Sequence, residues 1–251
     1  MSTCYNPFSL DGKTVLVTGA SSGIGRATAI ECSKSGAKLI IIGRNQERLQ
    51  ETFLTLEGEG HSKICVDLTD ETGMSAMIAE IPVIDGCVLC AGRGLSTPVQ
   101  FCTKEKFETV FNINFYSTAG LIALLYKKKK LKKQSSAVII DSIGGVYRFG
   151  FGSAIYGSSK AALDSFMKFA SREFAQRQVR VNCICPGMIE TPLIHRGTYT
   201  DENLAKDKEF YLGHRYGMPE EVAFGAIYLL SDATKWVTGT NLVIDGGNSI
   251  Y

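Results

Sequence analysis

The sequence predicts an α/β fold in which a doubly wound parallel sheet lies between two layers of helices. Short runs of apolar and β-branched residues alternate along the chain with segments of helical periodicity. Continuous apolar strands of this kind are typical of a parallel sheet that is buried on both faces. A glycine-rich turn joins the first such run to the first helical segment, and sheets of this class bind ligands beyond the carboxyl ends of their strands. We therefore expect one three-layer α/β/α domain over residues 1–251.

The composition is that of a globular protein with no nucleic-acid or membrane role. The 251 residues suit one α/β unit, with 45% hydrophobic and 21% charged residues. A net charge of +2 is too small to indicate nucleic-acid binding, and no motif for it is present. The N-terminus lacks the basic start and apolar run of a secretory signal, and no run approaches the ~18 apolar residues of a membrane span. We expect the eight cysteines to be reduced thiols in the cytoplasm.

Two of the cysteines, Cys87 and Cys90, have the C-x-x-C spacing of metal and redox sites. They lie in an apolar run that reads as a strand, where an odd separation sends side chains to opposite faces. We therefore expect no metal or redox site here.

The first strand is expected over residues 13–18, followed by G-A-S-S-G-I-G-R and a helical pattern. Glycines at positions 19, 23 and 25 would let the backbone turn tightly, approach a diphosphate and pack the helix on the sheet. The phosphate would lie at the positive end of the helix dipole. The spacing G-x-x-x-G-x-G meets the commoner pattern G-x-G-x-x-G only in part, so an ordinary strand-to-helix turn remains the alternative.

The remaining elements alternate up to the sixth strand. We expect strands at 38–43, 62–66, 83–90, 137–141, 179–185 and 241–244, and helices at 45–56, 70–80, 103–130, 154–176 and 219–230. Small or polar residues stand at most of the strand ends: Gly19, Asp67, Ala91, Gly92, Ser142 and Pro186. Because the carboxyl ends of parallel strands meet at one edge of a sheet, we expect these residues to converge on a ligand.

Tyr156 and Lys160 are four residues apart on a predicted helix, so their side chains share one face. A free phenol has a pKa near ~10 and exchanges protons poorly at neutral pH, but a nearby ammonium favours its ionised form. Ser142, on the preceding glycine-rich loop, could donate a hydrogen bond to a substrate carbonyl oxygen. The alternative is an ordinary amphipathic helix with a surface lysine.

Two further segments carry functional hypotheses. Residues 188–218 are poorly periodic and follow a strand end, which suggests a mobile lid or substrate loop. Its aromatic and basic side chains include Tyr199, Phe210, Tyr211, His195, Arg196, His214 and Arg215. The lysine-rich run 127–133 is expected to end a solvated helix, whose dipole favours cations there; docking of an acidic partner is the alternative.

Taken together, these motifs resemble the short-chain dehydrogenase/reductase family in its compact single-domain form. The matching motifs are T-G-A-S-S-G-I-G at 18–25, V-D-L at 66–68, A-G at 91–92, F-N-I-N at 111–114, Ser142 with Tyr156 and Lys160, N-C-I-C-P-G at 182–187, T-P-L at 191–193 and W-V-T-G-T-N-L-V-I-D-G-G at 236–247. The resemblance implies a Rossmann sheet, a nicotinamide dinucleotide and reversible hydride transfer between an alcohol and a ketone.

The resemblance also implies a role for each catalytic position. Tyr156 would donate or accept the proton, and Ser142 would orient the substrate oxygen and stabilise charge on it. Lys160 would hold the nicotinamide ribose and favour the ionised form of the phenol. Asn114 would kink its helix and anchor a proton-relay water. No metal is implied.

For the cofactor, the resemblance implies contacts with the adenine at Asp67 and with the carboxamide at Thr191. The full expected set is Gly19, Ser21, Ser22, Gly23, Ile24, Gly25, Arg44, Asp67, Leu68, Ala91, Gly92, Tyr156, Lys160, Pro186, Gly187, Ile189 and Thr191. Arg44 follows the second strand with no carboxylate before Glu47, which favours the 2′-phosphate of NADP(H) over NAD(H). Arg44 capping the next helix or stacking on adenine remains the alternative.

Two departures from the family pattern are visible. Cys90 stands where family members usually have asparagine before Ala91 and Gly92. The 14-residue separation of Ser142 and Tyr156 is one longer than the usual spacing, and we expect the extra residue to bulge within the glycine-rich loop.

The expected function is that of an NADP(H)-preferring reductase or dehydrogenase, most similar to 3-oxoacyl-acyl-carrier-protein reductases. A dehydrogenase of sugars, polyols or steroids is the first alternative, and a non-catalytic dinucleotide-binding sensor is the alternative from another class. The expected partner is a small carbonyl or alcohol substrate, free or on an acyl carrier. The family resemblance and the apolar C-terminal strand lead us to expect a homotetramer, with a dimer as the alternative.

Overall fold

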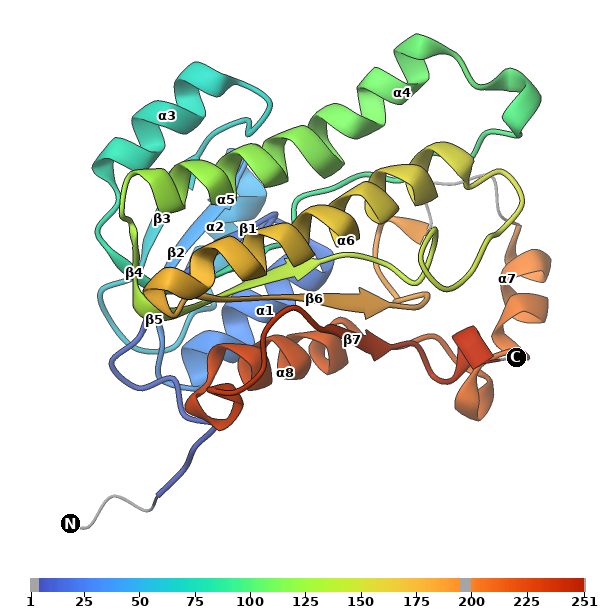
Figure 1. Cartoon of the computed structure of the whole chain (residues 1–251). Coiled ribbons are helices and arrows are strands. Elements are labelled where there is room, and N and C mark those ends of the chain that lie inside the picture. The colour runs from blue at the N-terminus through green and yellow to red at the C-terminus, as the bar shows by residue number, and fades with distance from the viewer. Residues whose placement is uncertain (1–4, 195–199, 251) are drawn as a thin grey trace.

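A seven-stranded sheet with the order β3-β2-β1-β4-β5-β6-β7 forms the centre of the computed structural model, which describes residues 5–194 and 200–250 (Figure 1). Its strands are β1 (Thr14–Thr18), β2 (Lys38–Gly43), β3 (Ser62–Cys65), β4 (Ile84–Leu89), β5 (Leu131–Ile140), β6 (Arg180–Pro186) and β7 (Asn241–Ile244). Every neighbouring pair is parallel. The predicted doubly wound α/β fold is therefore confirmed.

Helices cover both faces of this sheet. They are α1 (Gly23–Lys34), α2 (Gln46–Leu54), α3 (Glu71–Glu80), α4 (Lys104–Phe111), α5 (Ser117–Lys127), α6 (Ala154–Phe174), α7 (Asp201–Lys208) and α8 (Pro219–Leu230). One core packs α3, α5 and α6 on the sheet, and the second packs α1, α2 and α8 on the opposite face (Figure 1). The strands serve both cores, because Cys87 faces the first and Val88 the second. Each fully buried Leu or Ile contributes about 1.5–3 kcal/mol.

The fifth strand differs from its prediction. β5 begins at Leu131, six residues before the predicted start at 137, and Leu131 is fully buried and pairs with Ile84. The prediction for the lysine run 127–133 is therefore right for its start and wrong for its end: α5 ends at the exposed Lys127, but from Leu131 the run belongs to β5. Lys130 Nζ donates to the Ile81 carbonyl at 2.5 Å, which ties the run to the end of α3.

The predicted helix 103–130 is three consecutive pieces, with a π-helical turn at Asn112–Tyr116 between α4 and α5. The combined stretch Lys104–Lys127 is long and apolar enough to cross a membrane by length and composition, with a mean hydropathy of 1.2. Its apolar residues Leu121, Ile122 and Leu125 are fully or almost fully buried in the first core. Packing on the sheet accounts for this composition.

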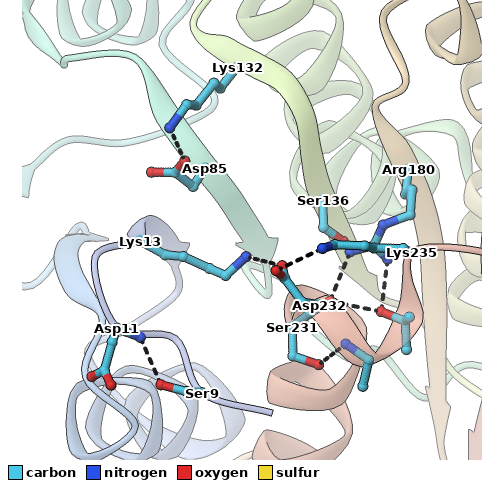
Figure 2. Close-up of polar contacts among 12 residues, drawn as sticks. Ser9, Asp11, Lys13, Asp85, Lys132, Ser136, Arg180, Ser231, Asp232 and Lys235 are labelled. Atoms are coloured by element: carbon cyan, nitrogen blue, oxygen red, sulfur yellow. Dashed lines mark hydrogen bonds and ion pairs between the residues drawn. The ribbon is translucent and has the colours of Figure 1, made fainter. Parts of the chain in front are cut away.

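The amino ends of the central strands are held by a polar network (Figure 2). Arg180, only 9% exposed, donates to the Leu229 carbonyl at 2.8 Å and to Thr234 Oγ1 at 2.9 Å, where its charge also complements the C-terminal dipole of α8. Ser136 Oγ donates to the same Leu229 carbonyl at 2.7 Å. Lys13 pairs with Asp232 beside them at 2.7 Å. These contacts fill the space at the amino ends of the strands. A ligand is therefore expected at their carboxyl ends.

The segment predicted as a lid contains the helix α7, which the sequence analysis did not predict. Leu204, Tyr211 and Tyr216 form a small separate core within it, with Tyr216 Oη donating to the Leu204 carbonyl at 3.1 Å. A bridge between Ile189 and Gly217 joins the two ends of the segment. Of the side chains highlighted there, His195, Arg196 and Tyr199 lie outside the described residues.

Candidate functional site

The residues expected to converge do follow neighbouring strands at one edge of the sheet. Gly19 follows β1, Ala91 comes soon after β4, Ser142 follows β5 closely and Pro186 ends β6, and these four strands are consecutive in the sheet. The loops after them form the candidate site.

The glycine turn is packed against the end of β4. Gly19 has a φ of +66°, and a Cβ there would lie 3.0 Å from the Ala91 backbone nitrogen. A Cβ on Gly25 would lie 2.4 Å from the Gly19 carbonyl oxygen, so only glycine fits at the start of α1. Thr18 Oγ1 accepts hydrogen bonds from the amides of Cys90, at 2.9 Å, and Ala91, at 3.2 Å. The two strand ends are thereby fixed together.

The N-terminus of α1 has the properties of an anion site. Its N-cap residue Ser22 makes no side-chain capping bond, and the first turn contains no acidic residue. A Cβ on Gly23 would lie 3.3 Å from Thr191 Cγ2, so Thr191 stands beside the glycine turn. Ser21 lies beside the end of β2, because its Oγ would be 3.3 Å from a Cβ on Gly43.

Arg44 follows β2 and lines an open surface pocket of about 680 Å³ with residues 45, 46, 47 and 50. It does not cap α2, because Asn45 is the N-cap and its Oδ1 accepts the Arg48 amide at 2.9 Å. The Arg44 guanidinium lies close enough to Asp67 to affect the pKa of its carboxyl group. Hydrogen bonds from Thr69, followed by the Arg44 guanidinium, hold the pKa of Asp67 below its usual value.

Three of the expected cofactor residues have side chains that pack in or against the hydrophobic cores. The side chain of Ile189 is 5% exposed and belongs to the second core, while that of Leu68 is 6% exposed and belongs to the first. Ile24 packs against the second core. Gly187 follows β6, where a Cβ would lie 3.0 Å from Asp245 Cα.

Tyr156 and Lys160 do share one face of α6. Lys160 is 5% exposed, and its Nζ lies 5.9 Å from the Tyr156 ring centroid and donates to the Ile140 carbonyl at 2.8 Å. Burial alone would lower the pKa of Lys160, but negative charge on Tyr156 and Asp141 outweighs it, and the pKa is raised. The structure therefore holds a charged ammonium beside the phenol at neutral pH.

Ser142 lies beside Tyr156, and Gly144 contacts the side chains of both residues. Ser142 Oγ accepts the Gly144 amide at 2.9 Å, which leaves its hydroxyl proton free to be donated elsewhere. A Cβ on Gly144 would lie 3.2 Å from Ser142 Oγ and 3.7 Å from Tyr156 Cε1, so Gly144 lies between the two side chains. The chain then bends, with the Gly145 amide donating to the Arg148 carbonyl at 2.9 Å. This bend lies within the glycine-rich loop that was expected to take up the extra residue.

Asn114 lies within the π-helical turn and is fully buried. Its Oδ1 accepts the Arg93 amide at 2.8 Å, and its Nδ2 donates to the Arg93 carbonyl at 3.1 Å and to Ser159 Oγ at 3.0 Å. Ser159 Oγ in turn donates to the Tyr156 carbonyl at 2.6 Å. Asn114 thus links the loop that contains Gly92 to α6, the helix that carries Tyr156. The helical stretch from α4 to α5 is irregular at Asn114, as expected.

The side chains of Cys87 and Cys90 are separated as their spacing in the sequence predicts. Cys87 belongs to the first core and Cys90 packs against the second, so they lie on opposite faces of the sheet. Burial raises the pKa of Cys90 to about 12, which leaves a neutral thiol beside the glycine turn. Over residues 5–194 and 200–250, no cluster of His, Cys, Asp or Glu could hold a metal ion.

The sequence analysis missed several residues of this site. Arg93 and Ser159 act through backbone and hydroxyl contacts that no sequence pattern marks. Gly145 and Gly157 touch each other, since a Cβ on Gly145 would lie 2.1 Å from the Gly157 carbonyl oxygen. Asp141, directly before Ser142, is 3% exposed. An acidic residue that ends an apolar run was the available signal for it.

The chain is similar to known proteins over nearly its whole length. The family model described as enoyl-(acyl carrier protein) reductase matches residues 19–249. The chain is 30% identical over 246 residues to dehydrogenase/reductase SDR family member 6 of Rattus norvegicus, covering 96% of this chain and 99% of the relative. It is 35% identical over 248 residues to the 3-oxoacyl-(acyl-carrier-protein) reductase of Chlamydia trachomatis, covering 95% and 98%.

A solved structure gives the same result. The chain is similar, with a TM-score of 0.87 and 28% identity, to a protein from Beutenbergia cavernae provisionally named an NAD(P)-dependent gluconate 5-dehydrogenase with bound NADP; the match covers 98% of this chain and 100% of that one. The family model spans most of the chain, and both curated relatives are matched over nearly their whole length. The chain therefore belongs to the short-chain dehydrogenase/reductase family of NAD(P)-dependent oxidoreductases.

Proposed function

We propose that this protein interconverts a ketone and a secondary alcohol, with Tyr156 as the acid and base and with Ser142, Lys160 and Asn114 in support. The observation that carries the proposal is the buried, charged Lys160 held 5.9 Å from the ring centroid of Tyr156, with Gly144 next to the side chains of both Tyr156 and Ser142.

The residues present fit a nicotinamide dinucleotide. The uncapped N-terminus of α1 and the glycine turn form a backbone cradle suited to a diphosphate, and Thr191 stands beside it. When bound, such a cofactor supplies the hydride. Asp67 follows β3, Ala91 and Gly92 follow β4 and Pro186 ends β6, so these four residues lie at the carboxyl ends of their strands, as Gly19 does at the end of β1.

The chain's own residues would manage the proton. In reduction, Tyr156 donates its phenolic proton to the carbonyl oxygen, and in oxidation the phenolate takes it back. The Ser142 hydroxyl, whose acceptor side is occupied by the Gly144 amide, donates to the same oxygen and stabilises charge on it. The Lys160 ammonium favours the ionised form that follows proton transfer. Asn114 fixes the β4 loop against α6, and would anchor a relay water there.

Within this activity we propose 3-oxoacyl thioesters as the leading substrate class, ahead of sugars, polyols and steroids. The similarity to 3-oxoacyl-(acyl-carrier-protein) reductases at 33–35% identity supports it. Exposed apolar side chains in the loop after Ser142 and in the segment 188–218 also support it, namely Phe149, Phe151, Leu193 and Phe210. Tyr211 adds no support because it is packed inside the core of that segment, and Lys130 and Lys132 of the lysine-rich run already have partners within the chain.

A substrate panel tests this ranking. Purified enzyme is offered acetoacetyl thioesters, sugars, polyols and steroid ketones, and nicotinamide absorbance is followed. Reduction of the thioester with the highest kcat/KM is the expected result, and rapid sugar oxidation without thioester reduction would reverse the ranking. No turnover of any substrate, with tight dinucleotide binding, would favour the sensor. The small-molecule substrate and a cytoplasmic location remain predictions.

We also propose that NADP(H) is preferred. Arg44 is an exposed cation at the end of β2, and its guanidinium fork suits a 2′-phosphate. One charge-assisted hydrogen bond is worth roughly 1.5–3 kcal/mol, which corresponds to a preference of about ten- to a hundredfold.

The test compares Arg44→Asp with the matched control Arg48→Asp, which makes the same charge change outside the pocket that Arg44 lines. Arg44→Asp should reverse the ratio of kcat/KM for NADPH and NADH, while Arg48→Asp should leave it nearly unchanged. An unmutated enzyme that is equally efficient with NADH would show that Arg44 does not read the phosphate.

A further inference from the structure

Asp141 is a buried acid that the proposed chemistry does not use. It lies between the end of β5 and Ser142, and its side chain is 3% exposed. Its amide donates to the Ile184 carbonyl at 2.8 Å, which fixes the residue against β6. Among residues 5–194 and 200–250 no side chain donates to its carboxylate oxygens, and the Ser142 amide favours the ionised form less than burial opposes it. A buried carboxylate with so little support favours its protonated form, so this group needs an explanation.

The titratable groups around Asp141 come from two elements. From α6 these are Lys160, Asp164 and Lys168, and from β6 they are the thiols of Cys183 and Cys185. Burial raises the pKa of Cys183 well above its usual value and that of Cys185 to about 12, so both thiols are neutral.

Of the α6 groups near Asp141, Asp164 and Lys168 form an ion pair with each other. Asp164 Oδ2 accepts from Lys168 Nζ at 2.8 Å, and Asp164 Oδ1 accepts from Asn241 Nδ2 at 2.6 Å. The hydrogen bond from Lys160 Nζ goes instead to a neutral carbonyl, that of Ile140, the residue before Asp141. Asp141 is therefore the carboxyl group placed to balance the charge of Lys160.

Lys160 also lies beside the phenol of Tyr156, with its Nζ 5.9 Å from the ring centroid. An ionised Asp141 cancels part of the field that the ammonium exerts on Tyr156, so the phenol keeps its proton to a higher pH. A protonated Asp141 leaves the full field in place. Burial, opposed in part by Lys160, raises the pKa of Asp141 to about 7, so the change between these two states falls in the working range of an enzyme.

We propose that Asp141 is a positioning residue that offsets the charge of Lys160 and so extends to higher pH the range over which Tyr156 can donate a proton. The proposal rests on the function proposed above. It predicts that removing the Asp141 carboxylate lowers the upper pH limit of ketone reduction.

The first test is the pH profile of Asp141→Asn, which removes the charge and keeps the shape. A unit charge in the same buried cluster as an ionisable group, at an effective dielectric constant of about 20, moves the ionisation midpoint of that group by on the order of one pH unit. The pH at which ketone reduction falls to half should therefore drop by about one unit. Asp164→Asn, which removes a carboxyl already paired with Lys168, should move the midpoint less. A midpoint of Asp141→Asn that stays in place or rises would overturn the proposal.

The second test needs no turnover. The apo-protein is labelled with ¹³C-tyrosine, Tyr156 is assigned by its loss in Tyr156→Phe, and its ionisation is followed by NMR in the wild type, Asp141→Asn and Asp141→Ser. Both Asp141 variants should ionise Tyr156 at lower pH, and Asp141→Glu should restore the wild-type midpoint in part. If no substrate is turned over but this shift is seen, the proposed function fails and the charge coupling stands. If turnover is normal and the shift is absent, only the coupling fails; should Asp141→Asn not fold, Asp141→Ser gives the same readout.

Discussion

Lys160 is a buried ammonium, and its environment explains why it keeps its charge. Burying a charge without compensation costs several kcal/mol. Here the Ile140 carbonyl accepts one hydrogen bond, and Tyr156 and Asp141 supply negative charge nearby. In the same environment Asp141 is a buried carboxyl to which no described side chain donates a hydrogen bond. The unfavourable free energy of burying charged groups around Lys160 therefore falls mainly on Asp141.

That cost predicts a pH-dependent stability. The pKa of Asp141 is about 7 in the folded protein, against an ordinary value of 3.8. Between these values the native state binds more protons than the unfolded state, so the free energy of unfolding falls as pH rises from about 4 to 7. The full shift corresponds to at most about 4 kcal/mol.

Urea unfolding of the wild type and of Asp141→Asn at pH 5 and pH 8 measures this contribution. The wild type should lose more stability than the variant between the two pH values, since the amide does not titrate. Equal losses in the two proteins would mean that Asp141 is not buried as the structure describes.

Among the elements, the loop between β5 and α6 determines how Ser142 meets Tyr156. Gly145 has a φ of +89°, and a Cβ there would lie 2.1 Å from the Gly157 carbonyl oxygen. Gly145→Ala should therefore displace the loop, with a stability loss of about 1–3 kcal/mol and a larger loss of kcat than of dinucleotide binding.

Gly150→Ala is the matched control in the same loop, because a Cβ there meets only Ser153 Oγ at 3.5 Å. It should retain nearly wild-type activity. If the two variants had equal activity, the contact between Gly145 and Gly157 would not position Ser142.

The elements that sequence predicted best are those with clear boundaries. β2 ends at Gly43 and α8 begins at Pro219, and both were predicted to the residue. The start of β5 was missed because lysines surround Leu131, and the pairing of Lys132 with Asp85 at 2.8 Å depends on the tertiary fold. α7 was missed because its eight residues carry one buried apolar side chain, Leu204.

The same distinction holds for the site. Tyr156, Lys160 and Ser142 could be predicted because their chemistry is visible in residue type and spacing. The contacts of Asn114 with Arg93 and Ser159 span 21 and 45 residues, so only the fold brings them together. The burial of Asp141 likewise depends on α6 packing across β5.

At the scale of the whole molecule, the apolar surface near the β7 edge predicts self-association. β7 is an edge strand of the sheet, and α8 packs on the face beside it. Trp236 is fully exposed, Phe224 is 54% exposed and Ile250 is 84% exposed. Large exposed apolar side chains near an unpaired edge are typical of an interface.

We predict a homotetramer, with a dimer as the alternative, and light scattering at micromolar concentration measures it. Phe224→Glu should weaken the assembly, whereas Leu54→Glu, at a 73% exposed position on α2, should not. A monomeric wild type would rule out the prediction.

The proposed function depends above all on proton transfer by Tyr156, and the turnover of Tyr156→Phe measures that role. The phenylalanine ring still packs beside Lys160, so only the transferable proton is lost. Tyr147→Phe, in the adjoining loop, is the control and should keep most of its activity. With the best substrate of the panel, Tyr156→Phe should lose a factor of order 10² or more in kcat while its dinucleotide Kd changes little. A variant that keeps more than half of the wild-type rate would contradict the assignment of Tyr156 as the acid.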